Sequence, residues 1–387
     1  MVLKVSQRGK VSPFIVMDVL RSGNRLQAQG KEVFHLELGQ PSTPAPRNVI
    51  NAALRAANED PIGYTEALGR FDLREKISEW YWQRYQVKVP RERIVVTTGS
   101  SGGFVLAFLA AFDQGDKIAL GNPSYPAYRN ILRALGITPI GLETSSDTRF
   151  QPTPQNLNSL NNPVDGLILA NPANPTGCMI EQHDLERLCV AARNRRIRLV
   201  SDEIYHGICF DFDAQTALKY DENAIIINSF SKYFCMTGWR VGWMIVPEAL
   251  VRSVECLAQN MYISAPTMSQ IAATAAFDSI DELEQNVFRY KRNRREILNG
   301  LIKMGLENFA PVDGAFYTYV DVSKYTEDSE TFCRDLLLET GVAATPGKDF
   351  DPLRGDTSIR LSFSGDRMMI KGAVERLGNW LAKKGGC

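Results

Sequence analysis

The sequence lacks an excess of charge of either sign. Lys and Arg together number 44, and so do Asp and Glu, so the formal net charge is zero. Proteins that bind nucleic acid or an anionic membrane through their overall field carry a marked positive charge. We therefore expect no nucleic-acid partner and no membrane partner, and any anion bound here must be held by a local group of donors.

Histidine is scarce, and cysteine shows no pairing pattern. The 3 histidines, His35, His183 and His206, lie far apart, and none has the spacing of a metal-binding pair. The 7 cysteines are odd in number and include no Cys-x-x-Cys pair. These observations predict no metal site and no disulfide framework, as in a protein of a reducing compartment.

Long hydrophobic runs are also absent. The longest, around residues 104–112, is far shorter than the ~20 residues that a membrane span requires. The first residues, MVLKVSQRGKVSPF, lack the apolar run of a secretory signal. We therefore expect a cytoplasmic protein.

Strand-like and helix-like patterns alternate in the middle of the chain. The apolar runs typical of buried strands are RIVVTTG, KIALGNPSY, GLILANP, RLVSDEIY, AIIINSFS and GWMIV. Helical patterns lie between them, at 102–112, 127–135, 181–194 and 247–260. Continuous apolar strands that alternate with helices predict an α/β fold, in which helices cover both faces of a mostly parallel sheet.

The chain of 387 residues is long enough for two domains. The pattern changes after about residue 275, where a long charged helix at 280–304 leads to GAFYTYVDV and SIRLSF, an α+β pattern. The first 45 residues are expected to join this part, because LELGQPSTPAP contains three prolines and has the composition of a linker. We predict a large domain at 46–275 and a small α+β domain formed by 1–45 and 276–387.

Polar residues and glycines gather where the predicted strands end. The groups are Thr98-Gly99-Ser100-Ser101, Asn122-Pro123-Ser124-Tyr125, Asn171-Pro172-Ala173-Asn174, Asp202-Glu203-Ile204-Tyr205 and Ser229-Phe230-Ser231-Lys232. In open parallel sheets, ligands bind outside the carboxyl ends of the strands. We therefore expect these groups to meet in one crevice.

Two of the groups suit an anion and a reactive amine. Ser100 and Ser101 open a helix, where backbone N–H groups and hydroxyls can hold a phosphate, although a plain strand–turn–helix corner has the same pattern. Lys232 ends a buried strand, and a desolvated lysine amine can form a Schiff base; a solvated surface lysine is the alternative. Arg240 follows eight residues later and can return to the same phosphate.

An acid and a second arginine complete the set. Asp202 can keep a pyridine nitrogen protonated, and Tyr205 and Asn174 can bond a phenolate oxygen of the same ring. A strand-end cap or a carboxylate pair for a metal would show the same Asp-Glu pattern. Arg360, within the strand-like SIRLSF, is either an exposed-face residue or a buried fork for a carboxylate.

The order and spacing of the motifs resemble one family. NPANPTG, DEIY, SFSKYFCMTGWRVG and RLSF, preceded by GYTEALGRFDLR and TTGSSGG, resemble the class I/II aminotransferases of fold type I, which depend on pyridoxal 5'-phosphate (PLP). The resemblance spans residues 39–364, and its most specific parts are NPANPTG and the lysine motif with its downstream arginine. It implies an enzyme that moves an amino group between an L-amino acid and a 2-oxo acid.

The resemblance implies a role for each matching residue. Lys232 is expected to hold PLP as a Schiff base and, once freed, to move the proton between the substrate Cα and the cofactor C4'. Asp202 is expected to pair with the pyridine nitrogen, and Tyr125 to stack on the ring. Asn174 and Tyr205 are expected to bond the ring oxygen O3'.

Further positions are implied for the phosphate, the substrate and a second subunit. The expected phosphate ligands are Ser100, Ser101, Gly102, Ser229 and Arg240. Gly39 and Arg360, with Asn174, are expected to hold the α-carboxylate of the substrate. Tyr64 matches a tyrosine that reaches the phosphate of the neighbouring subunit in this family, which implies a homodimer.

Some features leave the substrate open. Ala173 stands where many relatives carry a larger polar residue. No arginine is assigned to a distal carboxylate, so aspartate specificity is not predicted; the candidates by type alone are Arg21, Arg25, Arg70 and Arg292. Phe14 and Phe34 fit either an apolar pocket or the core.

Two other functions would use the same features. A PLP-dependent β-lyase that acts on a sulfur amino acid would employ the same Lys232, Asp202 and Arg360. A PLP-binding transcription regulator would carry an additional N-terminal DNA-binding domain, for which too little chain precedes residue 39. We prefer the aminotransferase interpretation.

Overall fold

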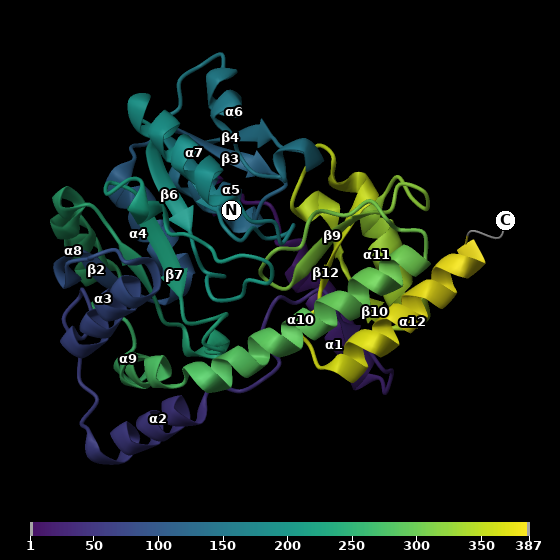
Figure 1. The fold of residues 1–387 in the computed structure, drawn as a ribbon, viewed down its shortest axis with the longest axis horizontal. Helices are drawn as coiled ribbons and strands as arrows, with labels where there is room; N and C mark the ends of the chain where they lie inside the picture. Colours follow the sequence, from purple (N-terminus) through teal and green to yellow (C-terminus); the bar gives the residue numbers. More distant parts are fainter. Residues whose placement is uncertain (1–2, 385–387) are drawn as a thin grey trace.

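The computed structural model describes residues 3–384, and its largest element is a seven-stranded β-sheet (Figure 1). The strand order is β2-β8-β7-β6-β5-β3-β4, and β8 runs antiparallel to both of its neighbours while the other pairs are parallel. The strands are β2 (Ile94–Thr97), β3 (Lys117–Asn122), β4 (Thr138–Glu143), β5 (Gly166–Ala170), β6 (Arg198–Asp202), β7 (Ile225–Ser229) and β8 (Gly242–Ile245). The predicted α/β fold with a mostly parallel sheet is confirmed.

Helices cover both faces of this sheet, which explains why its strands other than the edge strand β4 are continuous apolar runs. On one face, Ile225 and Ile227 of β7 join an apolar cluster with α4 (Gly99–Ala111), α5 (Pro126–Leu135) and α8 (Glu248–Tyr262). On the other face, Ile226 joins a cluster with α3 (Phe71–Tyr85), α7 (Gln182–Asn194) and α9 (Thr267–Thr274). The helices predicted from the sequence at 102–112, 127–135, 181–194 and 247–260 correspond to α4, α5, α7 and α8, with ends that differ by three residues or fewer.

Two smaller sheets lie beyond the large one. In one, β12 (Ser358–Ser362) pairs antiparallel with β9 (Tyr317–Asp321) and with β11 (Thr345–Pro346). In the other, β1 (Phe34–His35) pairs parallel with β10 (Val342–Ala343), which brings the first part of the chain beside the last. The domain boundaries at 45/46 and 275/276 stay a prediction.

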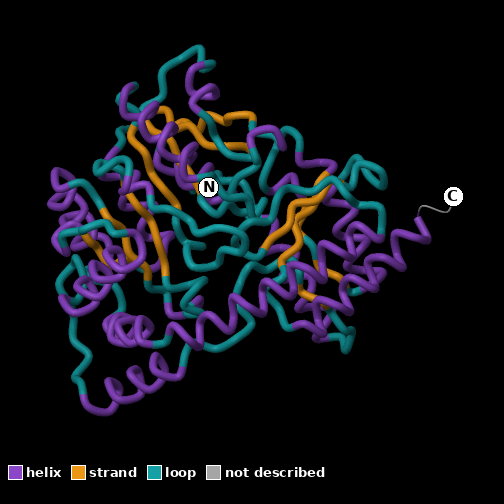
Figure 2. Tube along the Cα trace, viewed as in Figure 1, coloured by secondary structure: helices purple, strands orange, loops and turns teal. Residues whose placement is uncertain are grey.

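The remaining helices are spread over both parts of the molecule. α10 (Ile280–Lys303) is the long helix in Figure 1, and it reaches from the large-sheet part to the small-sheet part, where α12 (Arg367–Lys384) packs on it. Figure 2 shows the strands grouped in two regions, with helices outside them. The other helices are α1 (Ile15–Ala28), α2 (Arg47–Glu59), α6 (Pro154–Asn158) and α11 (Ser329–Thr340).

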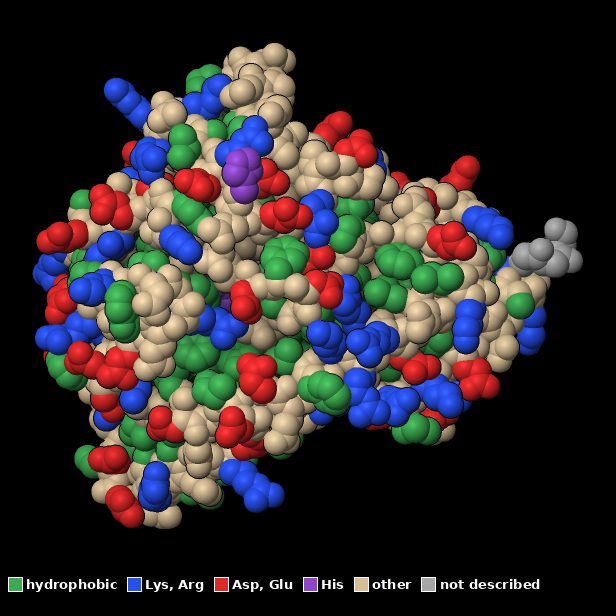
Figure 3. All heavy atoms as spheres, viewed as in Figure 1, with side chains coloured by type: hydrophobic (Ala, Val, Ile, Leu, Met, Phe, Trp, Pro, Cys, Tyr) green, Lys and Arg blue, Asp and Glu red, His purple; other side chains and the backbone are tan. Residues whose placement is uncertain are grey.

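The surface carries charges of both signs. Figure 3 shows Lys and Arg side chains interspersed with Asp and Glu over the face it presents, in keeping with the zero net charge. Within residues 3–384, no helix combines the length and the apolar character that crossing a bilayer requires. The same residues contain no cluster of three or more His, Cys, Asp or Glu suited to a metal ion.

Candidate active site

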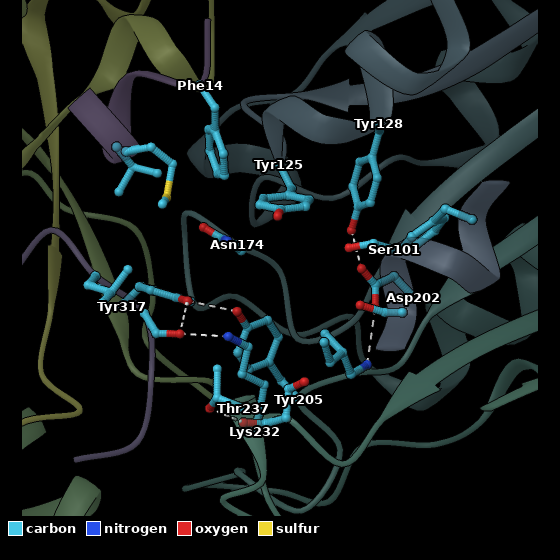
Figure 4. A pocket seen from close by; sticks show the side chains of 18 of the residues that line it. Phe14, Ser101, Tyr125, Tyr128, Asn174, Asp202, Tyr205, Lys232, Thr237 and Tyr317 are labelled. Atoms are coloured by element: carbon cyan, nitrogen blue, oxygen red, sulfur yellow. Dashed lines mark hydrogen bonds between the residues drawn. The ribbon is translucent and has the colours of Figure 1, made fainter. Parts of the chain in front are cut away.

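A cavity of about 170 Å³ lies at the carboxyl ends of β5, β6 and β7 (Figure 4). The predicted site residues that line it are Gly39, Ser100, Ser101, Tyr125, Asn174, Asp202, Tyr205, Lys232, Arg240 and Arg360. The groups at the strand ends therefore meet as expected, because parallel strands bring their carboxyl ends to one edge. The loop before α2, the start of α1, β9 and β12 close the cavity from the opposite side.

Three predicted site residues do not line this cavity. Gly102 lies one turn into α4, where an added Cβ would meet the Thr98 hydroxyl at 2.4 Å. Ser229 is buried and donates to the Val241 carbonyl at 3.2 Å, whereas Ser231 lines the cavity. Tyr64 is 82% exposed and lies away from it in this chain.

Lys232 follows β7 and projects into the cavity. Its Nζ donates a 2.6 Å hydrogen bond to the Gly39 carbonyl, seen as a dashed line in Figure 4. Burial lowers the pKa of Lys232 to about 8, and the nearby guanidinium groups of Arg360 and Arg240 act in the same direction, opposed by the Asp202 carboxylate. A solvated surface lysine is therefore excluded, and the amine is suited to act as a nucleophile and base near neutral pH.

Asp202 ends β6 and is buried on the other side of the cavity. One carboxylate oxygen accepts from the Tyr128 hydroxyl, and the other accepts from the Ile204 N–H at 3.1 Å. Burial raises the pKa of Asp202 to about 6, while these two hydrogen bonds lower it. The carboxylate thus caps its own strand end and also lines the cavity, and its role toward a ring nitrogen stays a prediction.

The start of α4 and Arg240 form a site for an anion. Ser100 and Ser101 line the cavity at the first turn of this helix, whose N–H groups and dipole favour negative charge. Arg240 has a left-handed backbone with φ of 52°, and its guanidinium lies 2.5 Å from the point where a Cβ on Gly99 would stand. Gly99 is therefore required by close approach as well as by its own φ of 76°.

Arg360 is a buried fork and not an exposed-face residue. It is 2% exposed, and its guanidinium lies 4.5 Å from the ring centre of Tyr317. Its Nη1 donates to Asn174 Oδ1 at 2.9 Å, and its Nη2 donates to the Glu37 carbonyl and to Thr345 Oγ1. These bonds fix the plane of the guanidinium, and Nε has no hydrogen-bond partner within the described chain. The fork can therefore receive a carboxylate.

Tyr317 is a site residue that the sequence analysis missed. Its hydroxyl lies 2.7 Å from the Tyr205 hydroxyl and 3.5 Å from the Gly39 carbonyl. A Cβ on Gly39 would stand 1.7 Å from the Tyr317 hydroxyl, so only glycine fits there. The antiparallel pairing of β9 with the strand of Arg360 could have indicated Tyr317, but the pairing itself was not predicted.

An apolar wall completes the cavity. Phe14, Val16, Met17 and Leu38 line it, and the Phe14 ring meets the Tyr125 ring edge to face with centres 5.5 Å apart (Figure 4). The two possibilities left open for the aromatic residues are thereby resolved, because Phe14 lines the pocket whereas Phe34 belongs to the core.

The arginines considered for a distal carboxylate lie elsewhere. Arg21 pairs with Asp18 at 2.7 Å and Arg70 with Asp72 at 2.9 Å, and Arg25 and Arg292 are exposed. None of them lines the cavity. The cationic side chains that the described chain supplies to it are those of Lys232, Arg240 and Arg360.

Comparisons with known proteins decide the family. The family model described as aminotransferase class I and II matches residues 31–377. A valine–pyruvate aminotransferase of Mycobacterium tuberculosis is 45% identical over 98% of both chains. The crystal structure of an aminotransferase from the same species is 44% identical, covers 99% of this chain and 100% of its own, and superposes with a TM-score of 0.97. This chain belongs to the class I and II aminotransferases.

More distant relatives of this aminotransferase act on different substrates. A (5-formylfuran-3-yl)methyl phosphate transaminase of Methanocaldococcus jannaschii is 34% identical over 96% of this chain and 97% of its own. The aspartate aminotransferase of Thermus thermophilus, solved with maleate, is 27% identical over 98% of this chain and 100% of its own, with a TM-score of 0.93. These relatives support PLP-dependent transamination and do not favour a lyase.

The residues of this aminotransferase fit PLP. The anion site at the start of α4 matches a phosphate, and a buried Asp202 matches a protonated ring nitrogen, whose charge would offset the cost of burying the carboxylate. Lys232 lines the same cavity, where its amine could form a Schiff base with an aldehyde. When bound, the cofactor supplies an electron sink for negative charge that develops on the substrate Cα.

Proposed function

We propose that this aminotransferase exchanges the amino group between a branched aliphatic L-amino acid, such as valine, and a small 2-oxo acid, such as pyruvate. One observation carries the proposal: the cavity presents one carboxylate fork, Arg360, together with an apolar wall that includes Phe14 and Val16. Burying a second carboxylate against this wall would be costly, because a buried charge requires a partner. The 45% identical relative, a valine–pyruvate aminotransferase, supports the same substrate class.

Each residue at the reacting centre has a proposed task. Lys232 would hold the cofactor and, when freed, would carry the proton between the substrate Cα and the cofactor C4'. Its pKa of about 8 supports this task, because a group that gives and takes one proton works best near the ambient pH. Asp202 keeps the ring nitrogen protonated, and Tyr205 and Asn174 bond the ring oxygen.

Other residues orient the ligands. Arg360 and Gly39 would hold the α-carboxylate of the substrate, and Tyr125 would stack on the cofactor ring. The proposed phosphate ligands are Ser100, Ser101, Gly102, Ser229 and Arg240, to which the position of Ser231 in the cavity wall adds a further hydroxyl. Of these, Gly102 and Ser229 lie behind the residues that line the cavity.

We also propose a homodimer in which Tyr64 contributes to the neighbouring phosphate site. Tyr64 is 82% exposed, and its loop is held by a 2.6 Å hydrogen bond from Thr267 Oγ1 to the Gly63 carbonyl. Tyr64→Phe should weaken PLP binding while sedimentation still reports a dimer. A monomer in sedimentation, or unchanged PLP affinity, would contradict this role.

A cytoplasmic location is part of the proposal. It is supported by the free thiols of all six cysteines that the structure describes, since such thiols persist in a reducing compartment. Cell fractionation followed by detection of the protein tests it.

A substrate panel tests the proposed function. The PLP-loaded protein is given valine, alanine or aspartate with pyruvate or 2-oxoglutarate, and the new oxo acid and amino acid are measured. Valine should exceed aspartate in kcat/KM by roughly 100-fold, because the second carboxylate lacks a partner. An aspartate rate equal to or above that of valine would refute the proposal, and ammonia with pyruvate as products would favour a lyase.

A further inference from the structure

Asp349 provides the cap of α1, the helix whose first residues form the apolar wall. Its two carboxylate oxygens accept from the backbone N–H groups of Ile15 and Val16, each at 3.2 Å. The residue at the N-cap position is Phe14, whose side chain has no acceptor atom. A carboxylate from more than 330 residues further along the chain therefore accepts from the free N–H groups at the start of this helix, and its negative charge complements the helix dipole.

The same turn is joined to the opposite side of the cavity. Asp349 ends a short 3-10 helix, Gly347–Asp349, and its carbonyl accepts from Arg129 Nη2 on α5 at 2.7 Å. The following carbonyl, of Phe350, accepts from Arg129 Nη1 at 2.9 Å and from the Ser124 N–H at 3.1 Å. Ser124 directly precedes Tyr125, so residues 349–350 connect the start of α1 with the loop that carries Tyr125.

This connection joins the two segments whose aromatic rings meet in the wall. Phe14 meets Tyr125 with ring centres 5.5 Å apart, and Val16 lines the cavity beside it. Asp349 is 3% exposed and does not line the cavity, so it can influence a substrate only through the residues that it holds. A pocket for a branched side chain requires such a fixed wall, because side-chain selectivity in an apolar pocket depends on close packing.

We propose that Asp349 is a positioning residue for substrate specificity, which caps α1 and thereby holds Phe14 and Val16 at the distance from Tyr125 that fits a branched aliphatic substrate. The inference rests on the proposed function for the class of substrate. Asp349 lies outside the reacting centre. Lys232, the base of the proposed mechanism, is held by different contacts.

The first test compares valine with alanine in Asp349→Ala and Asp349→Asn. Asp349→Ala removes both acceptors, so the preference for valine over alanine should fall by roughly tenfold, through a higher KM for valine with kcat retained. Asp349→Asn keeps one acceptor and should give a smaller fall. Asp18→Asn is the matched control, since it removes an exposed acid from the first turn of the same helix and should leave the preference unchanged. Equal preferences in wild type and Asp349→Ala would overturn the proposal.

A double-mutant cycle tests whether Asp349 acts through Phe14. Phe14→Ala removes the wall residue directly and should also reduce the valine preference. If the cap acts through this ring, the double variant should lose little more than either single variant, since coupled residues are not additive. Fully additive losses would overturn the proposal.

Protease sensitivity tests the cap independently of the substrate. Trypsin can cut after Arg25, an exposed residue within α1, only when the helix opens locally. Asp349→Ala should be cut there at least about fivefold faster than wild type and Asp18→Asn, while circular dichroism shows an intact fold. Unchanged cleavage would overturn the inference, whereas faster cleavage in an enzyme that does not prefer valine would refute the proposed function alone.

Discussion

The substitution Asp202→Asn tests whether the Asp202 carboxylate serves the cofactor or only caps the end of β6. In the cofactor-free protein, burial raises the pKa of Asp202 from its ordinary 3.8 to about 6. The folded state therefore holds its proton more tightly than the unfolded state does. The stability that this provides is complete below pH 3.8 and is lost as the pH rises through about 6.

The magnitude follows from the two pKa values. Relative to the protonated form, the Asp202 charge costs the cofactor-free protein about 1 kcal/mol at pH 4.5 and about 3 kcal/mol at pH 7.5. Asparagine has the shape of the carboxyl and no charge. We therefore expect cofactor-free Asp202→Asn to be more stable than wild type by about 3 kcal/mol at pH 7.5 and by about 1 kcal/mol at pH 4.5.

Urea unfolding at the two pH values measures this difference, and equilibrium dialysis measures PLP affinity. PLP affinity should fall in the same variant, because a neutral amide does not offset the charge of the ring nitrogen. Asp221→Asn is a matched control, since Asp221 is also buried and also accepts from a backbone N–H two residues on, but it lies outside the cavity. If Asp202→Asn destabilises the cofactor-free protein at pH 7.5, or leaves PLP affinity unchanged, Asp202 is a structural cap and the reasoning fails.

Two further substitutions test the anion sites. Arg360→Lys keeps the charge but loses the planar fork, so KM for the amino acid should rise roughly 10- to 100-fold in steady-state assays while PLP affinity stays the same; reduced PLP affinity would contradict the assignment. Gly99→Ala would bring a Cβ 2.5 Å from the Arg240 guanidinium and should weaken PLP binding at least about tenfold. Gly115→Ala introduces the same left-handed strain, but no atom lies within 4 Å of its Cβ. Equal losses of PLP affinity in the two variants would show that the contact with Arg240 is not the cause.

The sequence predicted the residues that follow strands better than those that depend on distant pairing. Lys232 and Asn174 follow β7 and β5, and Asp202 ends β6. The carboxyl ends of parallel strands meet at one edge whatever path the loops take. Tyr317 and Tyr128 were missed, because their positions depend on the pairing of β9 with β12 and on the orientation of α5. No local pattern reports either of these.

The direction in which a side chain points within a turn could not be predicted from the sequence either. Ser229 was the predicted ligand, but Ser231, two residues on, lines the cavity, while Ser229 donates to the Val241 carbonyl. The wall at Phe14 was left open for a similar reason. Its position depends on a carboxylate, Asp349, that is far away in the sequence.

The lysine that carries the cofactor is the most direct test of the account. The PLP-loaded protein is reduced with borohydride, digested and analysed by mass spectrometry, with Lys232→Ala as the control. We expect the mass of the reduced cofactor on the peptide that contains Lys232 and on no other lysine, and no label in the variant. Label on a different lysine, or full label and turnover in Lys232→Ala, would contradict the assignment of this cavity as the active site.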